Sequence, residues 1–375
     1  MDRAASIQSI LVRAPNWIGD QVLAYLFFHY LRKSFPQARI AVACMPWVSS
    51  IQYQDLVDEV VVLSKPGSGN VLEKFKALRL DSQRLKLKGP WDLGISLPNS
   101  LSAAWLLSWA GCVRTRGFSG DFRGWLLNDR LPWAPASTLH RADAYLQLLN
   151  GLLPQNLGQV RGADLFWGVP PEAAEIDLDP GIPGVLKNGF EPQKSWGPAH
   201  SAEIPPGDYW VLAPGSAATA RKWPLEKFIA LTQLIIRETG WPAVVVGGPA
   251  EAMLGKTLGE LPKVLDRTAQ GAVSNSWPLF KNARFTIAND SGLAHVAAIC
   301  GKRTHVIWGA GDPKRTAPIG AGKVTITFNP VDCWPCERNV CAYEGAMEIQ
   351  CLTGIAPGQV WEDVQRGPRR APEND

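Results

Sequence analysis

Short apolar runs alternate with amphipathic stretches along most of the chain. The runs have the length and the Val, Ile and Ala content of buried strands, and the stretches between them repeat their apolar positions with the period of a helix. We expect strands at residues 9–14, 39–44, 60–63, 93–97, 210–213, 243–246 and 284–288, and helices at residues 22–35, 225–239 and 294–300. This alternation predicts parallel sheets with helices on both faces, the doubly wound α/β class.

The alternation is interrupted once, at residues 171–206, where Pro, Gly and Asp accumulate. Because 375 residues exceed the size of one ordinary core, we expect two α/β domains, at residues 1–170 and 207–365, joined by a linker at 171–206. Residues 366–375 are charged and rich in Pro, and we expect a disordered tail there.

The composition is that of a globular protein of the cytoplasm. Hydrophobic residues make up 46% of the chain, and no apolar run reaches the roughly 18 residues that a transmembrane helix needs. Residues 1–13 lack the apolar region and cleavage site of a secretory signal, so we expect a cytoplasmic protein with reduced thiols.

A polar loop lies where the expected strand at residues 284–288 meets a helix. Asp290 and Ser291 can cap this helix, and Gly292 lets a ligand approach the backbone closely. The free N–H groups at the helix start and the positive end of the helix dipole favour phosphate. The loop is therefore either an anion site or a capped helix start without a ligand.

A second loop of this kind follows the strand at residues 210–213. Gly215 permits an unusual backbone angle, Ser216 and Thr219 offer hydroxyls, and Arg221 and Lys222 bring two cations to the same loop. These groups together suit a diphosphate.

A third strand, at residues 243–246, runs into a Gly-Gly-Pro turn and then Glu251 at the start of the next helix. Acidic residues at such a place accept hydrogen bonds from ribose hydroxyls in other doubly wound nucleotide sites. The alternative for Glu251 is a first-turn acid that the helix dipole stabilises.

Basic residues are concentrated at residues 65–88, here called the basic segment, although the net charge of the chain is only +4. The basic segment contains Lys65, Lys74, Lys76, Arg79, Arg84, Lys86 and Lys88 against Glu73 and Asp81. It is either a solvated face or a surface that attracts an anionic partner, a phosphorylated glycolipid at a membrane or a nucleic acid.

Four of the seven cysteines, Cys333, Cys336, Cys341 and Cys351, lie close together near the C-terminus. Thiolates at such spacing can close a tetrahedral site for structural zinc or iron, and reduced cysteines that simply pack together are the alternative. A closed four-sulfur site has no open position for substrate, so a metal there would be structural.

With these motifs in place, the chain resembles the heptosyltransferases of glycosyltransferase family 9, which build the inner core of lipopolysaccharide. Three motifs carry the resemblance in chain order: Arg-Ala-Pro-Asn-Trp-Ile-Gly-Asp at residues 13–20, the loop at residues 213–224, and Asn-Asp-Ser-Gly-Leu-Ala-His at residues 289–295. Tyr25, Phe27 and Phe28 depart from the small residues that the family often has after the first motif, which leaves the acceptor and the subgroup open.

The resemblance implies the GT-B architecture, in which two Rossmann-like domains face each other across a cleft. It also implies inverting transfer that requires no metal ion or other cofactor for catalysis. In such a transfer a carboxylate takes the proton of the acceptor hydroxyl, and Asp20, at the carboxyl end of the first strand, is the candidate base. The alternative role for Asp20 is to cap the following helix.

The resemblance further implies roles in the C-terminal half. Lys222 and the backbone from Gly215 to Thr219 bind the ADP diphosphate, with Arg221 in support, and Asp290 holds heptose hydroxyls. The phosphate-binding amides implied by the last motif are those of Ser291, Gly292 and Leu293. His295, one turn into the helix, either reaches a phosphate or sugar or packs under the loop.

The expected partners follow from the same resemblance. The donor is ADP-L-glycero-D-manno-heptose, and the acceptor is a lipid-linked core oligosaccharide that the N-terminal domain receives at the cytoplasmic face of the inner membrane, with the basic segment on the acceptor side. A family member with another donor or acceptor is one alternative. A non-enzymatic nucleotide-binding or nucleic-acid-binding protein is another, but the sequence has no DNA- or RNA-reading motif.

Overall fold

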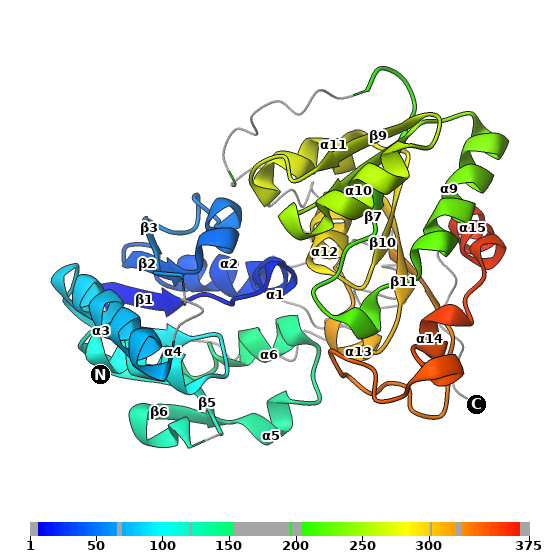
Figure 1. The fold of residues 1–375 in the computed structure, drawn as a ribbon. Helices are drawn as coiled ribbons and strands as arrows, with labels where there is room; N and C mark the ends of the chain where they lie inside the picture. The colour runs from blue at the N-terminus through cyan, green and yellow to red at the C-terminus, as the bar shows by residue number, and fades with distance from the viewer. Residues whose placement is uncertain are drawn as a thin grey trace, which may run out of the picture. The chain divides into compact units, whose positions relative to one another are not determined.

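The computed structural model describes residues 7–65, 70–120, 122–152, 196, 205–300, 302–319 and 324–367. The chain divides into two compact units, Met1–Val160 with Lys194–Gly197 and Arg161–Gln193 with Pro198–Asp375, here called unit 1 and unit 2. Each unit contains one six-stranded parallel sheet with helices packed on it (Figure 1). The predicted linker at residues 171–206 lies almost entirely outside the described residues.

Unit 1 has the strand order β3-β2-β1-β4-β5-β6. Its strands are β1 (Ser9–Arg13), β2 (Arg39–Cys44), β3 (Glu59–Val62), β4 (Trp91–Ser96), β5 (Cys112–Ser119) and β6 (Asp129–Pro132). Its α-helices are α1 (Ile18–Leu23), α2 (Tyr25–Ser34), α3 (Val71–Leu87), α4 (Leu101–Trp109), α5 (Trp133–Ala136) and α6 (Arg141–Gln147), and short 3-10 helices lie at Pro46–Ile51 and Arg123–Leu126.

Unit 2 repeats this topology, with the order β12-β11-β10-β7-β8-β9. Its strands are β7 (Trp210–Ala213), β8 (Ala243–Gly247), β9 (Val264–Thr268), β10 (Phe285–Asn289), β11 (Arg303–Trp308) and β12 (Val324–Phe328). Its α-helices are α9 (Leu225–Thr239), α10 (Ala252–Gly259), α11 (Trp277–Asn282), α12 (Gly292–Ile299), α13 (Pro313–Thr316), α14 (Gln350–Thr353) and α15 (Pro357–Arg366). Short 3-10 helices lie at Thr219–Arg221, Pro249–Glu251, Val273–Ser276 and Gly345–Met347. The predicted doubly wound α/β class is therefore confirmed in both units.

Helix α9 shows how the hydrophobic pattern produces this packing. Phe228, Leu231 and Ile235 recur at helical spacing and are fully buried in one cluster with Trp210 of β7. The helix ends where Gly240 adopts a φ of 75°, the left-handed conformation that glycine adopts without steric cost. The predicted bounds of this helix are confirmed because both the apolar period and the terminating glycine are local signals.

The helix expected at residues 22–35 begins earlier and is broken. Trp17 is the N-cap of α1, and Ala24 separates α1 from α2. The sequence analysis expected no helix between the strand at residues 9–14 and the helix at residues 22–35. In the structure Gly19 is buried inside the first helical turn, so Asp20 lies within α1 and does not cap it. Helix α15 likewise extends to Arg366, the first residue of the predicted tail.

Two of the three aromatic residues that set the N-terminal half apart from the family pattern belong to the core of unit 1. Phe27 and Phe28 are fully buried in α2, and their rings pack edge to face. These two side chains therefore fill the core and do not shape an exposed acceptor surface. Within the part of the chain that the structure describes, no helix combines the length and the apolar content needed to span a bilayer.

The last residue of β10, Asn289, ties two loops of unit 2 together. Its buried amide nitrogen donates to the carbonyl oxygen of Pro214 at 2.5 Å, and its amide oxygen accepts from the backbone N–H of Trp223 at 3.2 Å. The Ser216 hydroxyl adds a 3.2 Å hydrogen bond to the carbonyl oxygen of Asp290. The loops that follow β7 and β10 are therefore fixed to each other.

Replacing this amide should destabilise unit 2. Asn289→Ala leaves the carbonyl of Pro214 and the N–H of Trp223 buried without partners, and we expect the free energy of unfolding to fall by roughly 2–4 kcal/mol. Chemical denaturation followed by circular dichroism measures the change. Thr286→Val on the same strand is the control, because the buried Thr286 hydroxyl has no hydrogen-bond partner among the described residues and its loss should be nearly neutral. An Asn289→Ala variant as stable as this control would contradict the role of the amide.

Candidate active site

The loops predicted to bind an anion lie at the carboxyl edge of the unit 2 sheet. Strands β7 and β10 are neighbours in this sheet although β8 and β9 come between them in the chain. The strand order therefore reverses between β7 and β10, and open α/β sheets bind ligands beyond the carboxyl ends of their strands at such a reversal. The two expected loops meet at this point.

Gly215 is required here for close packing. A Cβ atom on Gly215 would lie 2.5 Å from Cγ of Glu251 and clash with it. Gly215 is not among the described glycines with positive φ. The prediction that it adopts an unusual backbone angle is therefore wrong. The Glu251 carboxylate accepts a 2.9 Å hydrogen bond from the backbone N–H of Gly248 within the loop after β8, and the side chain of Glu251 packs against Gly215 of the loop after β7.

The two hydroxyls of the β7 loop serve the shape of the loop. The Ser216 hydroxyl donates to the backbone after β10, as described above. The Thr219 hydroxyl donates to the carbonyl oxygen of Asn339 at 3.2 Å, and the N–H of Ala220 donates to the same oxygen at 3.1 Å. Both side chains were expected in the donor site, and the structure places them in its supporting framework.

Arg221 and Asp290 form an ion pair where the two loops meet. The guanidinium nitrogen Nη1 of Arg221 lies 3.2 Å from Oδ2 of Asp290. Asp290 is buried, and this burial raises the pKa of its carboxyl to about 6, although the charge of Arg221 acts in the opposite direction. Lys222, expected to lead in binding the diphosphate, is exposed, so Arg221 is the cation that lies inside the site.

The start of α12 differs from the capped helix expected from the sequence. Ser291 is the N-cap, but its side chain makes no capping hydrogen bond, and Asp290 turns toward Arg221 instead. Gly292 and Leu293 begin the helix and are half-buried, and the first N–H groups of a helix have no acceptor within it. His295, one turn further, is buried beneath the loop.

Three buried polar atoms at this point have no hydrogen-bond partner among the described residues. They are Nε of Arg221, Oγ of Ser291 and Oδ2 of Asp290, the last of which has only the ion-pair contact with Nη1 of Arg221. Because an unsatisfied buried polar atom costs roughly 1–3 kcal/mol, their convergence on one site indicates a place that a polar ligand fills.

Sequence reasoning missed two parts of this site. One is the loop after β11, where a Cβ atom on Gly311 would lie 2.6 Å from Oδ2 of Asp290 and one on Gly309 would lie 2.8 Å from the carbonyl oxygen of Ala220. The other is the Asn289 side chain, which was seen only as part of a motif. The Gly-Ala-Gly-Asp run after the apolar residues 306–308 was a signal for the missed loop.

The cysteine-rich segment packs against these loops. Trp334 donates its indole N–H to the carbonyl oxygen of Gly309 at 2.9 Å, and the backbone N–H of Glu337 donates to the carbonyl oxygen of Ala310 at 2.8 Å. Together with the Asn339 carbonyl that holds Thr219, these bonds make the segment a support for the site.

The cysteines themselves are free thiols. Cys351 is buried, and burial together with the nearby thiols of Cys336, Cys333 and Cys341 raises the pKa of its thiol to about 11. In the described ranges, no group of three His, Cys, Asp or Glu side chains is arranged to hold a metal ion. The zinc or iron site therefore stays a prediction, with reduced cysteines that pack without a metal as the alternative.

In unit 1, Asp20 lies in the first turn of α1 with its side chain 27% exposed. Its carboxylate oxygen Oδ1 lies 3.8 Å from Nε of Arg141 on α6, a residue that sequence reasoning did not connect with it. The turn before α1 is held by Arg13, which donates to Oδ1 of Asn16 at 2.5 Å, and by the indole N–H of Trp47, which donates to the Asn16 carbonyl at 2.6 Å.

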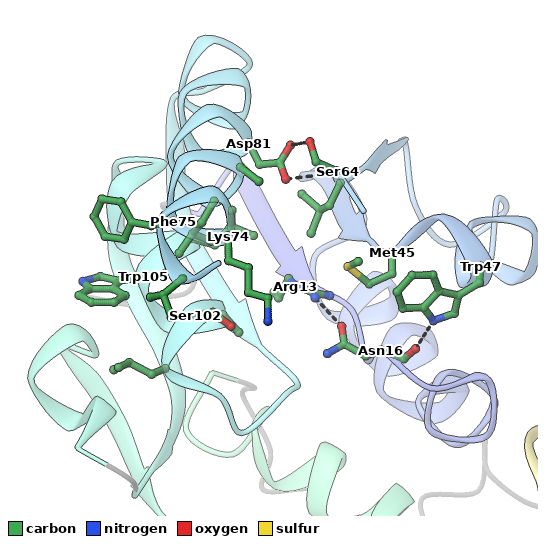
Figure 2. Close-up of a pocket in the computed structure, with 17 residues that line it drawn as sticks. Arg13, Asn16, Met45, Trp47, Ser64, Lys74, Phe75, Asp81, Ser102 and Trp105 are labelled. Atoms are coloured by element: carbon green, nitrogen blue, oxygen red, sulfur yellow. Dashed lines mark hydrogen bonds between the residues drawn. The ribbon is translucent and has the colours of Figure 1, made fainter. Parts of the chain in front are cut away.

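A cavity of about 450 Å³ lies beside this turn, between α3, α4 and the loops after β1, β2 and β3. Figure 2 shows Arg13, Asn16 and Trp47 on one side of the cavity and Phe75 and Trp105 on the other, with Lys74 extending from α3 between them. The basic segment thus forms one wall of this cavity through α3. Two of its cations are already paired, Arg84 with Asp81 at 3.1 Å and Lys88 with Glu59.

Known proteins share both the fold and the sequence pattern. The chain is 24% identical over 326 residues to lipooligosaccharide heptosyltransferase 2 of Haemophilus influenzae, covering 85% of this chain and 88% of that protein. A solved structure of Escherichia coli ADP-heptose lipopolysaccharide heptosyltransferase II superimposes with a TM-score of 0.68 at 21% identity, covering 96% of this chain and 98% of that one. A family 9 glycosyltransferase from Veillonella parvula superimposes with a TM-score of 0.70 at 20% identity, covering 96% of each chain.

The paired sheets and the family model agree. Two doubly wound units of this topology make up the α/β GT-B fold of these heptosyltransferases. The family model for glycosyltransferase family 9 (heptosyltransferase) matches residues 82–347, which include strands of both units and the loops of the candidate site. The chain is thus a glycosyltransferase that belongs to glycosyltransferase family 9.

Proposed function

We propose that this protein transfers heptose from ADP-L-glycero-D-manno-heptose to the lipid-linked inner core oligosaccharide of lipopolysaccharide. Membership of family 9 and the heptosyltransferase names of its relatives support the reaction class. The observation that carries the proposal is the set of unsatisfied polar atoms at the Arg221–Asp290 pair, which offers a cation for a diphosphate beside a carboxylate for sugar hydroxyls.

The donor is held by unit 2. The Arg221 guanidinium and the amides of Ser291, Gly292 and Leu293 bind the diphosphate, because a fixed cation and a helix N-terminus both favour negative charge. Asp290 accepts hydrogen bonds from the heptose hydroxyls.

Three further residues of unit 2 complete the donor site. Glu251 reaches the ribose with the carboxylate oxygen that does not bind Gly248. Lys222 contributes from the exposed edge of the loop, and His295 supports the loop from below.

Asp20 is the general base of the proposed reaction. The acceptor hydroxyl gives its proton to the Asp20 carboxylate while its oxygen attacks the anomeric carbon, and the bond from that carbon to the diphosphate oxygen breaks with its electron pair leaving on ADP. The attack comes from the face opposite the leaving group, so the configuration inverts. Arg221 and the α12 N-terminus stabilise the charge on ADP, which replaces a catalytic metal ion.

The acceptor is received by unit 1 at the cytoplasmic face of the inner membrane. Lys74, Lys76 and Lys86 of the basic segment have no ion-pair partner among the described residues and attract the anionic core. Each proposal about the acceptor rests on these unpaired charges and on the position of Asp20 in the same unit.

Asp20→Asn tests the proposed function directly. The amide cannot take the proton, so we expect the transfer rate to fall roughly 10²–10⁴-fold. Transfer from ADP-heptose to a purified truncated core acceptor measures the rate, and calorimetry should show unchanged ADP binding. Asp55→Asn, an exposed carboxylate of the same unit, is the control and should transfer normally. Near-normal turnover of Asp20→Asn would show that another group acts as the base.

The two cations of the β7 loop should differ in their contribution to ADP affinity. Arg221→Ala removes the charge inside the site and should cost roughly 1.5–3 kcal/mol of ADP binding. Lys222→Ala, at an exposed position, should cost less than about 1 kcal/mol because solvent screens its charge. Isothermal titration of both variants with ADP compares them, and a larger loss for Lys222→Ala would restore the order expected from the sequence.

Donor affinity should depend on pH through Asp290. Its pKa is raised to about 6, so the carboxylate is protonated as the pH falls through 6 and can no longer accept two hydroxyl hydrogen bonds. We expect ADP-heptose affinity to weaken below pH 6 in the native protein and to lose this dependence in Asp290→Asn. Titrations from pH 5 to 8 measure it, with Asp208→Asn, an exposed carboxylate of the same unit, as the control. A pH profile unaltered by Asp290→Asn would assign the titration elsewhere.

A further inference from the structure

We propose that the cavity of unit 1 binds an alkyl chain with an acidic group at one end, that is, an anionic amphiphile. Its volume of about 450 Å³ lies in the range of small-molecule sites. The inference deepens the proposed function and depends on it only for the source of the ligand.

The walls of the cavity are mainly apolar. Helix α3 contributes Val71, Phe75 and Leu78, and helix α4 contributes Leu101 and Trp105. Phe75 and Trp105 pack edge to face with their ring centroids 6.0 Å apart, and so the two helices are joined at the wall. Such a surface gains free energy when it covers hydrocarbon.

Most polar groups of the cavity are already bonded within the protein. Arg13 donates to Asn16 and to the carbonyl of Ala14, and the Asp81 carboxylate accepts from the backbone N–H and the hydroxyl of Ser64, each at 3.0 Å. A sugar presents many hydroxyls and needs many free partners. The bonded state of these groups therefore favours a hydrocarbon ligand.

Lys74 is the exception. Among the described residues that line the cavity, its ammonium group is a cation without an ion-pair or hydrogen-bond partner. Figure 2 shows its side chain extending from α3 toward the loop that carries Asn16. One free cation beside apolar walls matches one acidic group on a hydrocarbon chain.

The outer face of α3 has the same character. Leu72, Leu80 and Leu87 are exposed on it, with Leu80 at 59% and Leu87 at 88%. The cations of the basic segment lie on the same helix, and exposed aliphatic side chains beside Lys and Arg are typical of helices that lie on anionic lipid surfaces. An alkyl chain that enters the cavity would come from such a lipid surface.

Dodecyl phosphate, kept below its micelle concentration, is the probe for this site. We expect calorimetric titration to show one site, with affinity rising about fourfold for each added methylene from octyl to dodecyl phosphate. Lys74→Gln should weaken dodecyl phosphate binding about three- to tenfold and leave a neutral dodecyl amphiphile unaffected. Lys33→Gln, exposed on α2 of the same unit and outside the cavity, is the control and should bind as the native protein does.

Ser102→Trp tests the cavity itself. Ser102 is exposed in the first turn of α4 and lines the cavity, so an indole there fills the space without entering the core. We expect dodecyl phosphate affinity to fall at least about tenfold while ADP binding in unit 2 is retained, which shows that the chain is folded. Absence of binding to the native protein, or unchanged binding in both Ser102→Trp and Lys74→Gln, would overturn the proposal.

Transfer assays with acylated and deacylated core acceptor decide which molecule supplies the alkyl chain. If the acceptor's own lipid enters the cavity, Ser102→Trp raises the KM of the acylated acceptor only. If a separate membrane lipid enters, the variant shifts both KM values equally. The binding titrations need no donor. If the protein binds dodecyl phosphate but transfers no heptose, the proposed function is disproved and the proposal of an amphiphile site is not affected.

Discussion

The structure of the candidate site depends on one buried amide. Asn289, at the end of β10, holds both ends of the loop after β7. Its amide donates to Pro214 at the start of that loop and accepts from Trp223 at its end, although β7 and β10 are distant in the chain. This bridge helps to fix Arg221 and Asp290 relative to each other, since each side chain is carried by a different loop. The glycines at positions 215 and 311 serve the same end by letting the loops approach more closely than any side chain would allow.

The ion pair that this arrangement creates is incomplete in a way that suits a ligand. Burial removes water from Asp290, and one guanidinium at 3.2 Å does not fully replace that solvation, so the pKa of the carboxyl rises to about 6. Arg221, Asp290 and Ser291 each keep a buried polar atom without a hydrogen-bond partner in the described part of the chain. A diphosphate-linked sugar supplies acceptors for the first and donors for the second, so binding would remove a cost that the free protein carries.

Unit 1 has the same strand order but a different chemistry at its carboxyl edge. Most polar groups next to the cavity already form hydrogen bonds within the protein, as the Arg13–Asn16 and Asp81–Ser64 bonds show. The remaining walls are aromatic and aliphatic. One topology therefore offers two kinds of surface, a polar one in unit 2 and an amphiphilic one in unit 1. The proposed reaction needs both, since its donor is a charged nucleotide sugar and its acceptor is part of a lipid.

The sequence by itself determined the fold class, the strands at residues 39–44 and 210–213, helix α9 and the two loops of unit 2, because strand, turn and helix signals are local. It did not determine which side chains of those loops meet. Arg221 and Lys222 are adjacent and equally charged, and only the Asn289 bridge and the 3-10 turn at Thr219–Arg221 decide that the first faces Asp290 and the second faces solvent. The start of α1 at Ile18, the Arg141 beside Asp20 and the cavity behind α3 were likewise decided by tertiary packing, since each joins segments that no local pattern connects.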